Sequence, residues 1–163
     1  MTRHRLKNPE RRVFNRREES STVEKSFQLE RRFVKKGGMT EQARLRILVI
    51  DDDSFQCSIV SKLLGTMADC DVSTQTDARL AVPLIDSGWD LLLLDLNVPD
   101  MDGIEFLSEL AAASVKPPEV FFSGVEDRIL EVAEELAKSL AIDVLGSIAK
   151  PVSKESCRLF WIK

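Results

Sequence analysis

The chain lacks several residue types that zinc sites and nucleophile pairs use. Its 163 residues include one histidine, His4, in a polar N-terminal segment, and three cysteines with no CxxC pair among them. A single histidine in that position excludes a histidine-based zinc site and a histidine-activated nucleophile in the core. We expect Cys57, Cys70 and Cys157 to be free thiols of a protein in the reducing cytoplasm.

Long apolar runs are also missing. No run approaches the roughly 20 residues that a membrane-spanning helix needs. Residues 1–17 contain no apolar h-region, so we expect no secretory signal there. The sequence therefore predicts a cytoplasmic protein without a membrane partner.

Charge is divided unevenly along the chain. Residues 1–44 hold 13 Lys and Arg against 6 Asp and Glu, a net +7, whereas residues 45–163 hold 10 against 21, a net −11. We expect residues 1–44 to be a basic, disordered extension, and residues 45–163 to be one domain of ordinary size. The acidic domain argues against nucleic-acid binding. A nucleic-acid or anionic-surface arm, and a native start at Met39, stay open for the extension.

From Leu45 onward, short apolar runs alternate with amphipathic segments. The runs predict strands over residues 45–50, 71–74, 90–95, 120–123 and 144–149. The first helix is expected to follow a Ser54 cap and to end at Gly65. The second is expected to follow a Thr76 or Asp77 cap, to kink at Pro83 and to end near Gly88. Three more helices are expected over residues 103–113, from Asp127 onward and after Ser153. Repeated strand–helix units predict an α/β fold, a doubly wound parallel sheet with helices on both faces.

Polar residues stand where the predicted strands end. They are Asp51, Asp52, Asp95, Ser123 and Lys150. In open parallel sheets the functional site lies beyond the carboxyl ends of the strands, so these side chains should converge. These acids suit Mg²⁺, which prefers oxygen ligands. Asp52 and Asp95 can each supply a carboxylate oxygen, and a main-chain carbonyl just after Asp95 can supply a third oxygen. Asp51 can bind a water molecule that is itself bound to the metal.

The same group suits phosphoryl transfer. A carboxylate can attack a phosphoryl donor and form an acyl phosphate. The transferring group carries negative charge, which Lys150 can neutralise and to which the Ser123 hydroxyl can donate.

Three motifs resemble the signatures of response-regulator receiver domains. They are residues 47–53 (ILVIDDD), 93–103 (LLDLNVPDMDG) and 149–151 (AKP), and the resemblance spans about residues 44–157. It implies a flavodoxin-like sheet of five strands in the order 2-1-3-4-5. It also implies an Mg²⁺-dependent phosphoacceptor that is not itself an enzyme. The phosphoryl donor would be a sensor histidine kinase or a phosphotransfer protein, and the phosphorylated domain would act on an unknown output protein. A homodimer stays open.

The resemblance also implies roles for individual residues. Asp95 would be the phosphorylation site and Asp51 and Asp52 the acidic pair. The Asn97 backbone carbonyl would bind the metal, and Lys150 would contact the phosphoryl group. Ser123 matches the hydroxyl residue that responds to phosphorylation.

A narrower likeness and two departures accompany these motifs. Residues 53–56, 122–125 and 144–146 resemble receivers attached to EAL-type cyclic-di-GMP phosphodiesterases. Ser147 stands where the family often has an aromatic switch residue, and the chain has no tyrosine. The last helix is expected to be short. Either the chain is a truncated relative of a two-domain protein, or the helix exposes Phe160 and Trp161 as an apolar patch for a partner.

The motifs are also compatible with two other classes of protein. A degenerate receiver would act as a binding module without phosphorylation, yet every pocket residue is present. A haloacid-dehalogenase-type phosphatase needs a second acid two residues after its nucleophile, and that position is Asn97. No GxxxxGK[ST] motif occurs, which argues against ATP as the direct donor.

Overall fold

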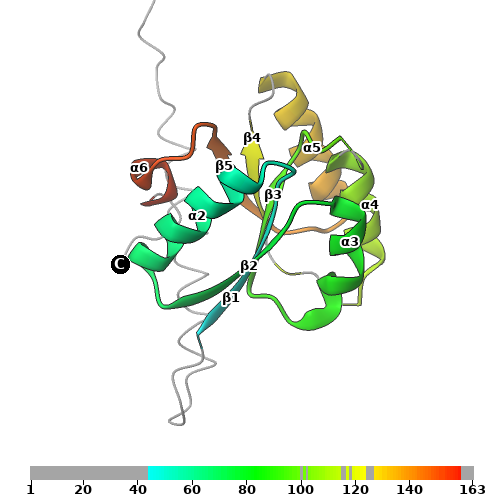
Figure 1. Cartoon of the computed structure of the whole chain (residues 1–163). Helices are drawn as coiled ribbons and strands as arrows, with labels where there is room; N and C mark the ends of the chain where they lie inside the picture. The colour runs from blue at the N-terminus through cyan, green and yellow to red at the C-terminus, as the bar shows by residue number, and fades with distance from the viewer. Residues whose placement is uncertain are drawn as a thin grey trace, which may run out of the picture.

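The protein is described by a computed structural model that covers residues 44–99, 101, 103–114, 117, 119–123 and 127–158. Five strands form one parallel sheet: β1 (Leu45–Ile50), β2 (Cys70–Gln75), β3 (Leu91–Asp95), β4 (Glu119–Ser123) and β5 (Val144–Ala149). Their order across the sheet is β2-β1-β3-β4-β5, which confirms the predicted order (Figure 1).

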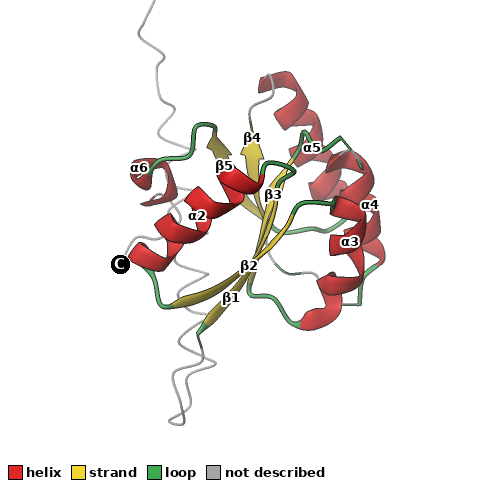
Figure 2. Ribbon diagram, in the orientation of Figure 1, coloured by secondary structure: helices red, strands yellow, loops and turns green. Residues whose placement is uncertain are grey.

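Helices cover both faces of this sheet (Figure 2). They are α2 (Ser54–Met67), α3 (Ala78–Ala81), the 3₁₀ helix η1 (Val82–Ser87), α4 (Gly103–Ala112), α5 (Asp127–Ser139) and α6 (Lys154–Arg158). Among the described residues, no helix is long and apolar enough to cross a membrane.

Alternation along β1 divides the core into two clusters. Ile47 and Val49 pack with α2 and α6, whereas Leu48 and Ile50 pack on the opposite face with α3, α4 and α5. Because side chains of a strand alternate between faces, an unbroken apolar strand needs cover on both sides. β3 is the extreme case, since all of its residues are buried.

Helix α2 starts and ends differently from the prediction. Its N-cap is Asp53 rather than Ser54, because the Asp53 carboxylate accepts hydrogen bonds from the backbone N–H groups of Phe55 and Gln56. Gly65 does not end the helix, which continues to Met67. A glycine inside a helix costs only about 1 kcal/mol, which burial of the neighbouring Leu64 can offset.

The second helical segment changes type at the predicted kink. Asp77 caps α3, which stops at Ala81, and the chain continues as η1 through Pro83 to Gly88. Proline has no N–H for the α-helical ladder, so the tighter 3₁₀ turn replaces it. Gly88 then closes the segment with a φ of 79°, which suits glycine.

Some predictions fall on residues outside the described set. These are the basic extension, apart from Arg44, and the short end of the last helix beyond Arg158. Arg44 pairs with Asp69 and Asp71 at the start of the sheet.

Candidate functional site

The predicted site residues gather at the carboxyl ends of four adjacent strands. Asp51 follows β1, Asp95 ends β3, Ser123 ends β4 and Lys150 follows β5. The register aligns Asp95 with Phe122 and Ser123 with Ala149, so these ends lie close to one level. The backbone thus places all four residues at one edge of the sheet. The Ser123 side chain lies outside what the structure describes.

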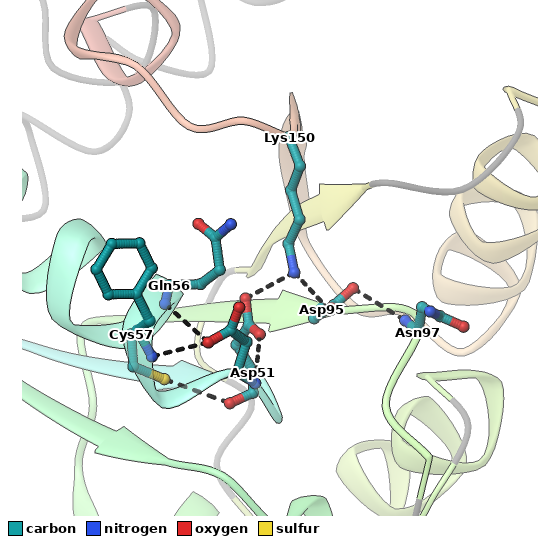
Figure 3. Close-up of polar contacts among 8 residues, drawn as sticks. Asp51, Gln56, Cys57, Asp95, Asn97 and Lys150 are labelled. Carbon is teal, nitrogen blue, oxygen red and sulfur yellow. Dashed lines mark hydrogen bonds and ion pairs between the residues drawn. The ribbon is translucent and has the colours of Figure 1, made fainter.

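Lys150 joins the two buried acids, as Figure 3 shows. Its Nζ lies 2.6 Å from Asp95 Oδ2 and 2.7 Å from Asp51 Oδ2. Asp51 is 1% exposed and Asp95 is 3% exposed. Carboxylates this deeply buried are costly to keep charged unless a cation lies beside them, and Lys150 supplies that cation.

Backbone groups hold the other carboxylate oxygens. Asp51 Oδ1 accepts from the Asp53 N–H at 3.0 Å, and Asp95 Oδ1 accepts from the Asn97 N–H at 2.9 Å. Asp51 Oδ2 is buried, and the contact recorded for it among the described residues is the ion pair with Lys150 at 2.7 Å. A carboxylate oxygen has two acceptor sites, so Asp51 Oδ2 can accept one more ligand besides Lys150.

Burial and charge pairing have opposite effects on the pKa values of the site. Burial raises the pKa of Asp51 above its usual value, and Lys150 opposes that rise only in part. For Lys150, burial alone would lower the pKa, but the carboxylates of Asp51 and Asp95 raise it above the ordinary value. Lys150 therefore stays positively charged at neutral pH.

Asp52 adds a third carboxylate. One ligand oxygen from each of Asp51, Asp52 and Asp95 lies within 4.8 Å of the other two, and Asp52 is exposed while the other two are buried. With one lysine against three carboxylates, the pocket retains excess negative charge. The clustered oxygen donors and the excess negative charge fit a hard divalent cation such as Mg²⁺.

Two neighbours of the pocket were not predicted in their present roles. Asp53 caps α2, and nothing in three consecutive aspartates distinguishes it from the two before it. Cys57, which was predicted only to be a free thiol, donates from its buried Sγ to the Asp51 carbonyl at 3.3 Å. Burial, followed by the charges of Asp51 and Asp53, raises the pKa of this thiol to about 11.

The sheet order and the place of the pocket define the flavodoxin-like class of doubly wound folds. The family model of the response regulator receiver domain matches residues 47–159, so the chain belongs to that family. It is a receiver domain of two-component signalling.

Individual relatives agree with this assignment. A protein-glutamate methylesterase/protein-glutamine glutaminase of Treponema denticola is 28% identical over 117 residues, which cover 71% of this chain and 31% of that protein. A crystal structure of a response regulator from Colwellia psychrerythraea is 29% identical, with a TM-score of 0.62, and the match covers 72% of this chain and 94% of that one.

A third match shows the fold alone. The receiver domain of a Pseudomonas aeruginosa sensor histidine kinase, solved with a magnesium ion in its active-site cleft, is 21% identical with a TM-score of 0.58, and the match covers 74% of this chain and 98% of that one. The chain spans about 31% of the length of the Treponema denticola relative. The narrower likeness to EAL-linked receivers is not confirmed by these matches.

Proposed function

We propose that Asp95 accepts a phosphoryl group from a phosphorylated histidine of a sensor kinase or phosphotransfer protein. The observation that carries this proposal is the Lys150 ammonium, which lies against two buried carboxylates from β1 and β3. The ammonium offsets the negative charge of these buried carboxylates, and a carboxylate is the nucleophile that the reaction needs.

In the proposed reaction, one Asp95 oxygen attacks the phosphorus as the bond from phosphorus to the histidine nitrogen breaks. The bonding electrons return to the imidazole, and the product is an aspartyl phosphate. Lys150 transfers its ionic contact from the Asp95 carboxylate to a phosphoryl oxygen, where negative charge builds up. Ser123, whose backbone ends β4, donates its hydroxyl to another phosphoryl oxygen.

Asp51, Asp52, Asp95 and the Asn97 main-chain carbonyl would hold Mg²⁺. The ion would supply positive charge that neutralises the phosphoryl oxygens. The clustered carboxylate oxygens support this assignment, as does the magnesium ion in the cleft of the Pseudomonas aeruginosa receiver.

The proposal extends to the whole molecule. Residues 45–163 act as the receiver, and residues 1–44 form a basic extension of it. The phosphorylated domain changes its contacts with an output protein or with a second copy of itself. It catalyses no reaction other than its own phosphorylation and dephosphorylation, and it works in the cytoplasm, which agrees with its three free, buried cysteines.

Labelling tests the proposal directly. Incubation of the full chain with acetyl phosphate and Mg²⁺ should add one phosphoryl group that base and hydroxylamine remove. Asp95→Asn should abolish this labelling, and omission of Mg²⁺ should reduce it severely. Asp53→Asn is the matched control, because asparagine also caps helices well and Asp53 serves the helix.

Two outcomes would contradict the proposal. Continued labelling of Asp95→Asn would mean that the nucleophile is another residue. A folded wild-type chain that takes up no phosphoryl group would favour the degenerate receiver instead.

A further inference from the structure

The Cys57 side chain contacts the backbone of the pocket from inside the core. Cys57 lies on the buried side of α2, in the cluster that α2 and α6 form on one face of the sheet. Its Sγ donates a hydrogen bond to the backbone carbonyl of Asp51 at 3.3 Å, as Figure 3 shows. A carbonyl oxygen can only accept, so the sulfur carries its proton in this contact. The thiol therefore links the helix to the chain segment that forms the pocket.

The Asp51 carbonyl lies just beyond the regular part of its strand. β1 ends at Ile50, and the Asp51 N–H still donates to the Gln75 carbonyl of β2 at 3.2 Å. Among the described residues, the donor to the Asp51 carbonyl is the Cys57 thiol. Asp51 is buried, so its carbonyl has little access to water. Because a buried carbonyl without a donor is costly, the thiol has a specific task at this point of the chain.

This carbonyl belongs to the peptide unit that joins Asp51 to Asp52. A peptide unit is planar, so the direction of its C=O bond also sets the direction of the Asp52 N–H and constrains the path of the chain on both sides. Both residues belong to the acidic cluster, whose third member is Asp95. Rotation of this peptide would move two neighbouring carboxylates relative to Asp95. The hydrogen bond from Cys57 opposes that rotation.

We propose that Cys57 is a positioning residue for the metal site, whose thiol holds the peptide between Asp51 and Asp52 in the orientation that lets both carboxylates serve one divalent cation. This inference rests on the proposed function, because it takes the acidic cluster as the Mg²⁺ site. Groups that orient metal ligands affect metal affinity without touching the metal, and their loss typically weakens binding by about ten- to a hundredfold. A thiol is a weak donor, so we expect the lower end of that range.

Cys157 provides a matched control. Like Cys57, it is a buried free thiol in the cluster that α2 and α6 form on one face of the sheet. Its backbone N–H donates to the Ser153 carbonyl at 3.1 Å, but no hydrogen bond among the described residues involves its Sγ. Replacement of Cys157 by alanine therefore removes the same sulfur from the same cluster without removing a donor from the pocket.

Three substitutions of Cys57 separate hydrogen bonding from packing. Cys57→Ser keeps a donor on a side chain of similar shape, Cys57→Val fills the space without a donor, and Cys57→Ala removes both. If the thiol acts only by packing, valine should be tolerated best, because serine places a hydroxyl among apolar side chains. If it acts as a donor, serine should behave like wild type, and valine and alanine should share one defect.

The test is a calorimetric titration of the full chain with Mg²⁺, which needs no phosphodonor. Cys57→Ala and Cys57→Val should raise the dissociation constant for Mg²⁺ about tenfold, whereas Cys57→Ser and Cys157→Ala should stay within about twofold of wild type. In labelling by acetyl phosphate, the Mg²⁺ concentration that gives half the maximal rate should rise by a similar factor in the alanine and valine variants of Cys57. Their rates at saturating Mg²⁺ should stay within about threefold of wild type. Melting temperatures measured without Mg²⁺ show that each variant is folded and report any loss of packing separately.

The possible outcomes separate this inference from the proposed function. Equal Mg²⁺ affinity in wild type, Cys57→Ala and Cys57→Val would overturn the positioning role, whatever the melting temperatures. So would a loss of affinity in Cys57→Ser or Cys157→Ala as large as that in Cys57→Ala, because either result would indicate packing. A wild-type chain that binds no Mg²⁺ would overturn this inference together with the metal site. A wild-type chain that binds Mg²⁺ but takes up no phosphoryl group would refute the proposed phosphoacceptor function, while the affinities of the variants would still decide the role of Cys57.

Discussion

Asp52 differs from the other two pocket acids because it is exposed, whereas Asp51 and Asp95 are buried beside Lys150. One of its carboxylate oxygens lies within 4.8 Å of an oxygen of each of those two acids, and like charges at such a distance repel each other. We predict that Asp52→Asn stabilises the metal-free chain by about 1 kcal/mol. We also predict that it removes most of the stabilisation by Mg²⁺, which for wild type is about 1.4 kcal/mol at ten times the dissociation constant. Urea unfolding with and without Mg²⁺ measures both effects.

The neighbouring acid provides the control. Asp53→Ala removes the cap of α2 and should destabilise the chain by about 1 kcal/mol, while the response to Mg²⁺ persists. A less stable Asp52→Asn with a normal response to Mg²⁺ would show that the carboxylate cluster is not the metal site.

At the residue scale, the location of the site could be predicted from the sequence, but the contacts between its side chains could not. Asp51, Asp95 and Lys150 could be predicted to converge because each follows an apolar run, and parallel strands share one carboxyl edge. The bridge that Lys150 makes between Asp51 and Asp95 could not be predicted, because it depends on the direction of each side chain after its strand. For the same reason the capping role of Asp53 was missed.

At the element scale, two glycines that look alike in the sequence differ in their surroundings. A Cβ built on Gly103, the first residue of α4, would lie 2.8 Å from Leu96 Cδ2 and 2.9 Å from Leu96 Cα. A Cβ on Gly65, inside α2, would have no atom within 4 Å. Gly103→Ala should therefore destabilise the chain by about 1–3 kcal/mol, whereas Gly65→Ala should stabilise it by about 0.5–1 kcal/mol.

The Gly103 variant should also affect the site, because Leu96 directly follows Asp95 and must shift to admit the methyl group. We expect slower labelling by acetyl phosphate in Gly103→Ala and unchanged labelling in Gly65→Ala. Chemical denaturation gives the two stabilities. If both alanine variants shift stability in the same direction, the close approach of Leu96 to Gly103 does not constrain the loop.

Strands were easier to predict than helix ends. The β1 run of Leu45–Ile50 was predicted with its observed bounds, because apolar runs of that length fit a buried parallel strand. Helix α2 was predicted to end at Gly65 and continues to Met67. Glycine only weakens a helix, and the packing of the helix, which the sequence does not reveal, decides whether it continues.

At the scale of the whole molecule, the last prediction concerns how phosphorylation spreads from the pocket. In the proposed reaction, a phosphoryl group on Asp95 would give Ser123 and Lys150, at the ends of β4 and β5, a new partner. Ser147 of β5 stands where the family often has an aromatic switch residue, and it pairs with Phe121 of β4. Ser147 is half-buried and has no aromatic ring that could rotate when Asp95 is phosphorylated. We therefore expect the change to be confined largely to residues 123–135, including the first turns of α5. Amide exchange with and without beryllofluoride, in Mg²⁺ throughout, measures it. Asp95→Asn should show no change, and altered exchange in β5 or α6 without any in residues 123–135 would refute this route.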